Sequence, residues 1–428
     1  MKINLFWFRR DLRMEDNTAL NAAMNAQNPV LPVFIFDEDI LNELPESDAR
    51  VSFIYDALHR MNITLQAHQS SLLILKGNTE KIWETICANY TVEKVFINRD
   101  YEPYALQRDR SVEEVLLKNG SQLISLKDQV IHEKSDVMKA DGTPYTVFTP
   151  YKNKWLQLYA PKKIETNINF KQFYKEEHSF PKLQTLGFKK SNTVVKPYTL
   201  DKIELYSETR NFPHLDSTSY LSPHLRFGTI SIRQIIAEHN GRDAVFLSEL
   251  IWREFFMQIL FHFPKVVSQN FRSKYDGIQW LNNELDFDNW CQGKTGYPLV
   301  DAGMRELNET GYMHNRVRMV TAGFLCKHLL IDWRWGEAYF AKKLLDYELS
   351  SNNGNWQWAA GTGCDAAPYF RIFNPTEQLK KFDAQLRYVK KWVPEFETLE
   401  YPLPIIDHKY ARTRALETYK SGINNQTS

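Results

Sequence analysis

The stretch Ile3-Asn4-Leu5-Phe6-Trp7-Phe8 is a short apolar run, and similar runs recur through the first part of the chain. The others are Val30–Phe36, Leu72–Leu75, Val95–Ile97 and Leu123–Leu126. Between them apolar residues return at helical spacing, most clearly in Val51–His68 and Tyr104–Lys118. Because buried strands that alternate with helices build a parallel sheet, residues 1–130 are predicted to form an α/β domain. This part contains no GxGxxG, so a Rossmann-type dinucleotide site is not expected in it.

The pattern changes beyond residue 130. Residues 131–197 are rich in Lys, Pro, Tyr and Asn, and we predict a long inter-domain linker that lies on the surface, with part of it packed because it is longer than ordinary loops. From Tyr198 onward helical periodicity dominates, and we expect an all-α domain over residues 198–415 and a disordered tail over 416–428. The helical stretches are Ile230–Glu238, Ala244–Phe261, Pro298–Thr310, Arg316–Leu330, Gly336–Glu348 and Thr376–Trp392.

The charge of the whole chain neither favours nor excludes a nucleic-acid partner, since the formal net charge is +1. The stretch Arg371–Lys391 nevertheless holds six basic residues against two acidic ones. The basic residues of this stripe are Arg371, Lys380, Lys381, Arg387, Lys390 and Lys391. Such a stripe is either a solvated helix face or a rim that follows phosphates.

Several kinds of site are disfavoured by motifs that the sequence lacks. The four cysteines have no CxxC spacing and the histidines have no metal-ligand spacing, so neither a disulfide framework nor a metal site is expected. HExxH, GxSxG and GxxxxGK[ST] do not occur, which disfavours hydrolases of these classes and P-loop ATPases. The N-terminal run is too short for a signal peptide, and no run approaches the roughly 18 apolar residues of a membrane span. We therefore expect a cytoplasmic protein without membrane contact.

Two neighbouring segments cluster polar groups. Thr218–Ser222 precedes a helical run, and hydroxyls with free N–H groups at a helix start suit a phosphate, although an ordinary capping segment looks the same. In the next long helix one face carries Glu249, Trp252, Arg253 and Phe256. This face suits a planar polar ligand, or it is a core aromatic stripe with solvated charges.

Two further segments combine amides with charged or aromatic groups. In Gly311–Met319, Arg316 and Arg318 cannot share a helix face equally, so one can meet a phosphate while the other pairs inside. Asn315 can bond a base edge, and a polar helix start is the alternative. The segment Asp346–Gly361 crowds two carboxylates, paired asparagines and two tryptophans into what we interpret as a loop. A loop with this composition rarely serves packing alone, so we predict a functional segment there.

Taken together, these segments resemble the photolyase/cryptochrome family, and within it the class I photolyases of cyclobutane pyrimidine dimers. The resemblance covers nearly the whole chain. The motifs that carry it are Trp7–Arg13 (WFRRDLR), Asp16-Asn17, Lys294–Ala302 (KTGYPLVDA), Met313–Met319, Leu330–Trp333 and Asn352–Pro375.

The resemblance implies a flavodoxin-like α/β domain and an all-α domain that holds FAD in a folded form. It also implies light-dependent repair of damaged DNA, duplex or single-stranded, by a monomeric carbon–carbon lyase. Photoexcited, reduced and anionic FAD gives an electron to the pyrimidine dimer, the cyclobutane ring opens, and the electron returns. The cofactor carries the hard chemistry, which explains the lack of acid–base and metal motifs.

A second, antenna chromophore is left open by the resemblance. Folate-binding relatives carry Asn-Glu where this chain has Tyr104-Ala105. Folate is therefore disfavoured, and a deazaflavin, an FMN or no antenna at all are the remaining possibilities.

The resemblance also assigns the cofactor contacts. FAD would meet Tyr206, Thr218, Ser219, Tyr220, Leu221, Ser222, Arg253, Asp346, Tyr347, Glu348 and Asn352. Asn352 would lie near flavin N5, where an amide favours the anionic flavin because it does not readily give N5 a proton. Glu348 stands where bacterial relatives usually have a second aspartate.

The DNA contacts are assigned in the same way. They are Arg210, Glu249, Trp252, Arg253, Phe256, Asn315, Arg316, Met319 and Trp358. Trp252 and Trp358 would wall the pocket, because stacking on their rings helps offset the unstacking of a flipped lesion. The expected catalytic residues are Glu249, Asn315, Met319 and Asn352. The tryptophans expected to pass electrons from the surface to oxidised FAD are Trp280, Trp333 and Trp356.

Within the family the pocket residues distinguish the substrates. The (6-4) photolyases have two histidines at the positions of Asn315 and Met319, and single-strand-acting DASH cryptochromes usually lack the tryptophan present here as Trp358. Repair of dimers in duplex DNA is therefore favoured. A signalling cryptochrome is the alternative, although such proteins typically carry a long C-terminal extension. A third interpretation, an α/β nucleotide-binding protein with a helical partner domain, sets the resemblance aside.

Overall fold

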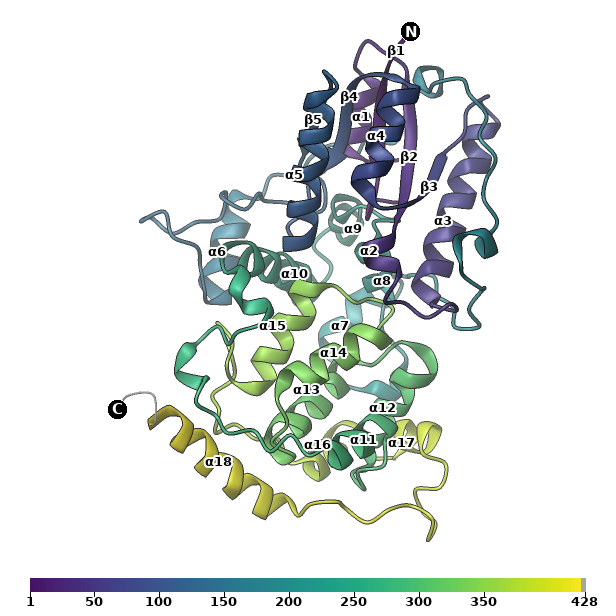
Figure 1. Cartoon of the computed structure of the whole chain (residues 1–428). Coiled ribbons are helices and arrows are strands. Elements are labelled where there is room, and N and C mark those ends of the chain that lie inside the picture. The colour runs from purple at the N-terminus through teal and green to yellow at the C-terminus, as the bar shows by residue number, and fades with distance from the viewer. Residues whose placement is uncertain (425–428) are drawn as a thin grey trace. The chain divides into compact units, whose positions relative to one another are not determined.

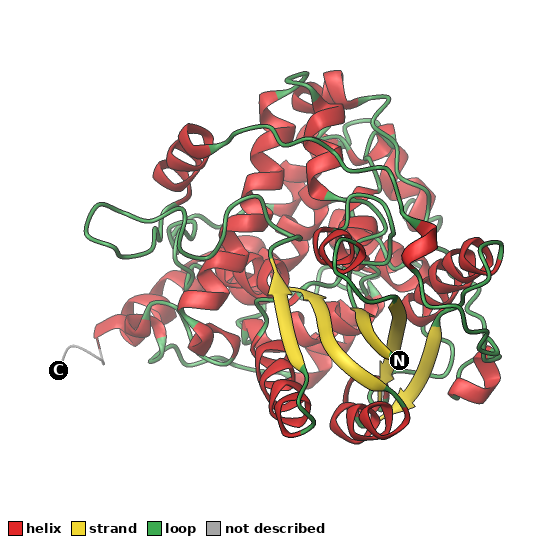
Figure 2. Ribbon diagram, turned by 90° about the horizontal axis from the view of Figure 1, so that it is seen from above, coloured by secondary structure: helices red, strands yellow, loops and turns green. Residues whose placement is uncertain are grey.

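Five parallel strands form one sheet in the order β3-β2-β1-β4-β5 in the computed structural model, which describes residues 1–424 (Figure 2). The strands are β1 (Lys2–Phe8), β2 (Val30–Asp37), β3 (Leu73–Gly77), β4 (Thr91–Asn98) and β5 (Gln122–Leu126). All five predicted strands are confirmed. β2 is buried along its whole length, as is typical of a central strand with both faces covered.

Helices cover both faces of this sheet. They are α1 (Thr18–Met24), α2 (Glu38–Leu41), α3 (Ala49–Gln66), α4 (Thr79–Asn89) and α5 (Pro103–Lys118). Alternate side chains of β1 enter opposite layers, since Phe6 packs in the cluster that contains Leu58 of α3, whereas Trp7 packs with Trp83 of α4 and Val112 of α5. The predicted α/β architecture is thus present.

The described chain divides into two compact units (Figure 1). Unit 1 comprises Met1–Asp136, Gln157–Tyr198 and Tyr220–Asn240. Unit 2 comprises Val137–Leu156, Thr199–Ser219 and the chain from Gly241 onward. These boundaries differ from the predicted division at residues 130 and 197, because each unit includes pieces of chain that are distant in sequence.

The predicted surface linker, residues 131–197, contains buried structure in both units. In unit 2, Trp155 of α6 (Phe148–Leu158) is buried and its indole N–H donates to Glu254 Oε1 at 2.7 Å. In unit 1, Phe173 is buried and bridges Val30 of β2. Part of the segment packs, as its length suggested, and the prediction of a surface linker does not hold for these parts because contacts distant in sequence bury them.

Two short helices of the predicted helical domain, α8 (Leu221–Phe227) and α9 (Ile232–His239), belong to unit 1. Arg233 of α9 donates from Nε to Asp16 Oδ2 at 2.8 Å and from Nη2 to Asp128 Oδ1 at 2.7 Å. Arg13 Nη2 lies 2.5 Å from the other Asp128 oxygen. Burial alone would raise the pKa of Asp128, but the two guanidinium groups hold it well below its ordinary value.

Replacing Arg233 by Lys should lower the melting temperature at pH 7, because a single ammonium cannot make these forked contacts. We expect a cost of about 1.5 kcal/mol for a lost hydrogen bond to a charged group. The folded pKa of Asp128 lies below the unfolded value of about 3.9, so this contribution is present at neutral pH and is lost as the pH falls through the acid range. Thermal unfolding followed by circular dichroism tests this. Lys189→Ala, which removes an exposed ion pair with Glu46, is the control and should have little effect.

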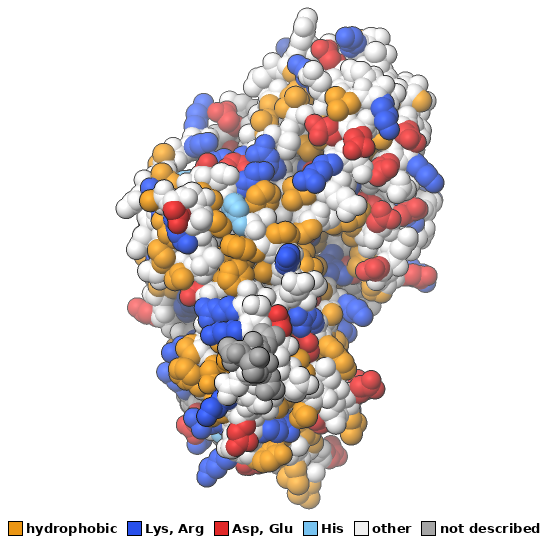
Figure 3. All heavy atoms as spheres, turned by 60° about the vertical axis from the view of Figure 1, so that its left-hand side comes forward, with side chains coloured by type: hydrophobic (Ala, Val, Ile, Leu, Met, Phe, Trp, Pro, Cys, Tyr) orange, Lys and Arg blue, Asp and Glu red, His pale blue; other side chains and the backbone are white. Residues whose placement is uncertain are grey.

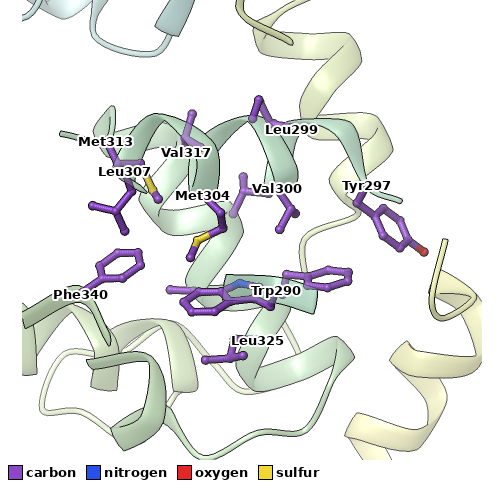
Figure 4. Close-up of a cluster of buried hydrophobic side chains, with 14 of the residues drawn as sticks. Trp290, Tyr297, Leu299, Val300, Met304, Leu307, Met313, Val317, Leu325 and Phe340 are labelled. Carbon is purple, nitrogen blue, oxygen red and sulfur yellow. The ribbon is translucent and has the colours of Figure 1, made fainter. Parts of the chain in front are cut away.

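Unit 2 is helical. Its further helices are α7 (Tyr206–Thr209), α10 (Ala244–His262), α11 (Glu284–Gln292), α12 (Pro298–Thr310), α13 (Asn315–Gly323), α14 (Trp333–Lys343), α15 (Leu349–Ala360), α16 (Pro375–Phe382), α17 (Arg387–Trp392) and α18 (His408–Asn424). A π-helical turn, Phe324–His328, follows α13, and short 3₁₀ turns occupy Ile203–Leu205, Pro213–Leu215, Pro264–Val267 and Ser273–Tyr275. Two further 3₁₀ turns, Phe170–Gln172 and Leu183–Leu186, belong to unit 1. The largest core cluster surrounds Trp290, on which Met304, Leu325 and Phe340 converge (Figure 4). None of the helices within residues 1–424 has the length and apolar character of a membrane span.

Several predicted helix ends are wrong. The stretch Thr376–Trp392 forms two helices, because Leu386 is left-handed with φ 57° and Asp383 accepts from the backbone N–H groups that begin α17. The stretch Gly336–Glu348 ends five residues early, at Lys343, where Leu344 becomes extended. The predicted tail is also wrong up to Asn424, since α18 is regular and Tyr419 is fully buried. Residues 425–428 lie outside the described part of the chain.

Candidate active site

One face of α10 keeps polar and aromatic groups partly exposed although most of the helix is buried. Asp243 caps the helix by accepting from the N–H groups of Val245 and Phe246. Glu249, Trp252 and Arg253 are each half-buried, while Phe256 is buried. They follow one face of the helix, as their spacing predicted.

Two side chains from α7 contact this face: Tyr206, the first residue of the helix, and Arg210, the residue that directly follows it. Arg210 Nη1 lies 2.6 Å from Glu249 Oε1, and its guanidinium carbon lies 5.3 Å from the ring centre of Tyr206. Burial, followed by the charge of Glu249, raises the pKa of the Tyr206 phenol, which stays protonated at neutral pH. Three residues that the sequence predicted separately therefore form one cluster.

The indole of Trp252 is held by phenylalanines. The Phe148 ring stacks on it with centroids 3.7 Å apart and planes 8° apart. Phe255 and Phe256 meet it at centroid distances of 5.5 and 5.3 Å. No sequence pattern pointed to Phe148, because it lies within the segment predicted to be a linker.

The start of α13 presents an amide outward. His314 accepts through Nδ1 from the backbone N–H of Arg316 at 3.2 Å. Burial, and then the charges of the two arginines of this helix, lower the pKa of His314 to about 4, so it is neutral at pH 7 and can serve as this acceptor. Asn315 is exposed and Met319, one turn later, is half-buried, so both reach the same side of the helix.

The two arginines of α13 diverge, as predicted. Arg316 Nη2 donates to Asn211 Oδ1 at 2.6 Å. Burial and the nearby Arg210 lower the pKa of Arg316 from its ordinary value. Arg318 instead lies 3.0 Å from Asp346 Oδ2.

Asp346 and Glu348 differ in how fully they are engaged. Asp346 Oδ1 is buried and has no hydrogen-bond partner within the described chain. Glu348 caps α15, because its Oε2 accepts from Ser350 Oγ at 2.6 Å and from Ser351 N at 2.9 Å. The unsatisfied oxygen of Asp346 calls for a donor that the described chain does not supply.

The segment predicted as a loop is the helix α15, so that prediction is wrong. Its capping by Glu348 and the left-handed Gly361 after it define a regular helix despite the many Asn and Ser residues. Asn352 and Trp356 lie one turn apart and are both buried, whereas Trp358 is half-buried. α15 packs against α10 and against α13, so the three helices bring their predicted residues into one region of unit 2.

The amide of Asn352 has a fixed orientation. Its Nδ2 donates to Glu337 Oε1 at 2.8 Å and to the Glu337 carbonyl at 3.1 Å. Burial raises the pKa of Glu337, and the bond from Asn352 opposes this rise. Glu337 is a site residue that the sequence did not reveal, since it occupies an ordinary position in the helical stretch Gly336–Glu348.

The three tryptophans proposed to carry electrons differ in burial. Trp356 and Trp333 are 2% and 1% exposed, and Trp333 Nε1 donates to Asn270 Oδ1 at 2.9 Å. Trp280 is half-buried and meets Tyr419 edge-to-face with centroids 5.8 Å apart. The three rings therefore differ in their access to solvent, and their role in electron transfer stays a prediction.

The predicted phosphate segment crosses from one unit to the other. Thr218 and Ser219 belong to unit 2, whereas Tyr220, Leu221 and Ser222 belong to unit 1. Tyr220 is left-handed, with φ 52°, and α8 begins directly after it. The start of a helix at this point agrees with the sequence pattern, and the phosphate contact itself stays a prediction.

The predicted basic stripe is exposed. All six of its basic residues are exposed in α16, α17 and the chain before them. Lys380 lies 2.9 Å from Glu377 and Lys390 lies 3.1 Å from Glu397, so part of the charge is neutralised. The face drawn in Figure 3 likewise intersperses basic and acidic side chains, in keeping with the small net charge.

Among residues 1–424 no group of three or more His, Cys, Asp or Glu side chains could hold a metal ion.

The chain is similar to known proteins over nearly its whole length. Residues 4–168 match the family model described as DNA photolyase, and residues 246–400 match the one described as the FAD binding domain of DNA photolyase. The chain is 35% identical to the deoxyribodipyrimidine photo-lyase of Agrobacterium fabrum, over 97% of each chain. A crystal structure of a bacterial class III photolyase from Agrobacterium tumefaciens has 34% identity and a TM-score of 0.88, covering 99% of this chain and 98% of that one. An archaeal photolyase from Sulfolobus tokodaii, solved with two FAD molecules, has 35% identity and a TM-score of 0.86, covering 98% and 100%.

Proposed function

The chain belongs to the DNA photolyase family, and from this membership we propose that it is a deoxyribodipyrimidine photo-lyase that repairs cyclobutane pyrimidine dimers in DNA under blue light. The observation that carries the proposal is the similarity over 97% of both chains to an enzyme of that name. The cluster on α7, α10, α13 and α15 supports it, because it joins aromatic, amide and charged groups in one region of unit 2.

The residues of unit 2 fit FAD. Asp346 Oδ1 is a buried acceptor that needs a donor, and the hydroxyl or ring N–H groups of FAD offer one. Arg318 pairs with this carboxylate, while Arg253, Tyr347, Glu348, Thr218 and Ser219 would complete the part of the binding site that belongs to unit 2. When bound and reduced, FAD supplies the electron that opens the dimer under light.

Replacing Asp346 by Ala should weaken FAD binding. The substitution removes the buried acceptor and leaves Arg318 without its anionic partner. We expect a loss of about tenfold in affinity, the equivalent of one hydrogen bond to a charged group. The ratio of FAD to protein after dialysis measures the effect, with Glu377→Ala, at an exposed ion pair, as the control. Undiminished retention of FAD by the Asp346 variant would count against this contact.

The roles proposed for Asn352 and Glu337 concern the flavin ring. Because both amide hydrogens of Asn352 have acceptors on Glu337, its Oδ1 is the atom left to face N5. An oxygen there would accept a hydrogen bond from the N5–H group that reduced flavin carries, which favours the reduced form over the oxidised one. Glu337 acts through Asn352 and is in this respect a positioning residue.

The roles proposed for α10 and α13 concern the flipped lesion. Trp252 and Trp358 offer rings for stacking, while Glu249 and Asn315 offer hydrogen-bond partners for the thymine edges and Met319 lines the cavity. Arg210 positions Glu249 through their ion pair. Arg210 and Arg316 would also meet DNA phosphates, a contribution that is independent of sequence and sensitive to salt.

Finer assignments rest on particular positions. Asn315 and Met319 occupy the positions where (6-4) photolyases have histidines, which supports the dimer as the lesion. We propose that the chain acts as a monomer.

Membership of class I stays a prediction, since a class III photolyase of known structure is about as similar to the chain as the curated relative. A second FAD joins the candidate antenna chromophores, because the S. tokodaii relative was solved with two FAD molecules.

Repair itself provides the test. Purified protein, reduced and mixed with duplex DNA that contains dimers, should remove them under blue light and leave them intact in the dark. Mass spectrometry of the released chromophores should identify FAD and any second chromophore. A yellow protein that responds to light but leaves dimers intact would favour the alternative, a signalling cryptochrome, and a protein without flavin would reject both.

A further inference from the structure

The first residue of α6 contacts the ring that we place at the wall of the lesion pocket. Phe148 is buried, and its ring lies parallel to the half-buried indole of Trp252, with planes 8° apart and centroids 3.7 Å apart. Phe255 meets both rings nearly edge-on, at 5.8 Å from Phe148 and 5.5 Å from Trp252. The plane of the indole is thus fixed by one stacked and one perpendicular neighbour.

The backbone of Phe148 makes a second attachment. Its N–H donates to Asp365 Oδ2 at 3.0 Å. Asp365 follows α15, the helix that carries Trp358, by five residues. The first turn of α6 therefore contacts α10, which carries Trp252. It also contacts the segment that follows α15, the helix that carries Trp358.

The rest of α6 is anchored so that Phe148 cannot easily withdraw. Tyr151 and Trp155 lie on the same face of α6 as Phe148, and both are buried. Trp155 Nε1 and Tyr151 Oη donate to Glu254 Oε1 at 2.7 and 3.4 Å. Because a buried carboxylate that loses its donors is costly, these bonds hold α6 against α10.

We infer that Phe148 is a positioning residue for lesion binding, which holds the indole of Trp252 in the plane in which it stacks on the dimer. The inference rests on the proposed function of the site. A half-exposed indole without this neighbour would explore several rotamers, and ordering it on binding would reduce affinity. A ring fixed in advance avoids that cost, so Phe148 acts on binding rather than on the ring-opening step.

An ordinary packing role predicts a different result. If Phe148 only stabilised the fold, its removal would act independently of Trp252, and the two effects on affinity would add. If Phe148 acts through the indole, removing Phe148 should cause no further loss of DNA affinity in a variant that already lacks the Trp252 indole. A double-mutant cycle on DNA affinity separates these two roles.

The experiment uses the FAD-loaded protein and duplex DNA with one dimer, with binding measured by fluorescence anisotropy in the dark. We expect Phe148→Ala to lower affinity by about 3- to 10-fold, the worth of one aromatic pair. FAD content and the first-order repair rate of prebound DNA should be retained. The double variant Phe148→Ala/Trp252→Ala should bind no more weakly than Trp252→Ala alone, and Phe148→Tyr should restore affinity because it keeps the stacked ring.

The matched control is Phe287→Ala, which removes a partly buried ring that packs on the core at Trp290. It should leave DNA affinity unchanged. Unchanged affinity in Phe148→Ala, or losses that add in the double variant, would overturn the inference. If Phe148→Ala does not fold, Phe148→Leu keeps an apolar side chain without a ring and carries the same comparison. Failure of the unmodified protein to bind dimer-containing DNA would instead reject the proposed function.

Discussion

Trp252→Ala should bind dimer-containing DNA about 10- to 100-fold more weakly than the unmodified protein, because stacking of a base on an aromatic ring is worth about 1–3 kcal/mol. The indole is half-buried on the polar face of α10, so part of it remains available to a ligand. Its neighbours Phe148, Phe255 and Phe256 are side chains of the protein itself, so the loss should fall on DNA rather than on FAD. Anisotropy in the dark and the FAD absorption band measure the two properties separately.

The control for this variant is Trp392→Ala, which truncates another partly buried tryptophan of unit 2. Trp392 lies on α17 and packs on the core, so we expect its loss to leave the ratio of the affinities for damaged and undamaged DNA unchanged. For Trp252→Ala the ratio should fall, since undamaged bases are not flipped out to meet the ring. Equal affinity of Trp252→Ala and the unmodified protein for damaged DNA would remove Trp252 from the pocket wall.

Helix α12 shows what the sequence could predict. Its bounds are those expected, because Pro298 fits the first turn of a helix and Gly311, with φ 69°, takes the left-handed conformation that ends one. Both signals are local and depend on residue type alone. The strands of the sheet were predictable for a similar reason, since continuous apolar runs identify strands that are buried on both faces.

Helix α15 shows what local pattern could not predict. Asn, Ser and Gly are poor helix formers, so Asn352–Asn355 suggested a loop. The helix is stabilised instead by packing: a Cβ at Gly354 would lie 2.2 Å from the Phe256 ring, and a Cβ at Gly336 would lie 2.1 Å from the Trp356 ring. These glycines allow α10 and α14 to approach α15 closely, a requirement that is set by partners distant in sequence.

In the candidate site, too, some residues could be predicted from the local sequence pattern and others could not. The helical spacing of Glu249, Trp252 and Arg253 could be read directly, and so could the divergence of Arg316 and Arg318. Phe148 could not, because it enters the site from a polar segment whose helix depends on Glu254, about a hundred residues away. Residues that act by touching other side chains leave no periodic pattern.

Trp280→Phe should abolish light-driven reduction of oxidised FAD while leaving repair by chemically reduced protein unchanged. Of the three proposed electron carriers, Trp356 and Trp333 are almost fully buried, whereas Trp280 is half-buried and can exchange electrons with a reductant in solution. Phenylalanine keeps a ring that can pack edge-to-face on Tyr419 but is much harder to oxidise than tryptophan. The series would therefore lose its outer member without losing its packing.

The two readouts separate electron supply from repair. Photoreduction is followed as bleaching of the oxidised flavin band under blue light with an external reductant, and repair is measured after dithionite reduction in the dark. Trp335→Phe makes the same substitution on α14, two residues from Trp333, and should photoreduce normally. Because repair returns its electron, it needs no supply from Trp280, so loss of both activities would indicate damage to the site. Normal photoreduction in Trp280→Phe would exclude this residue from the path.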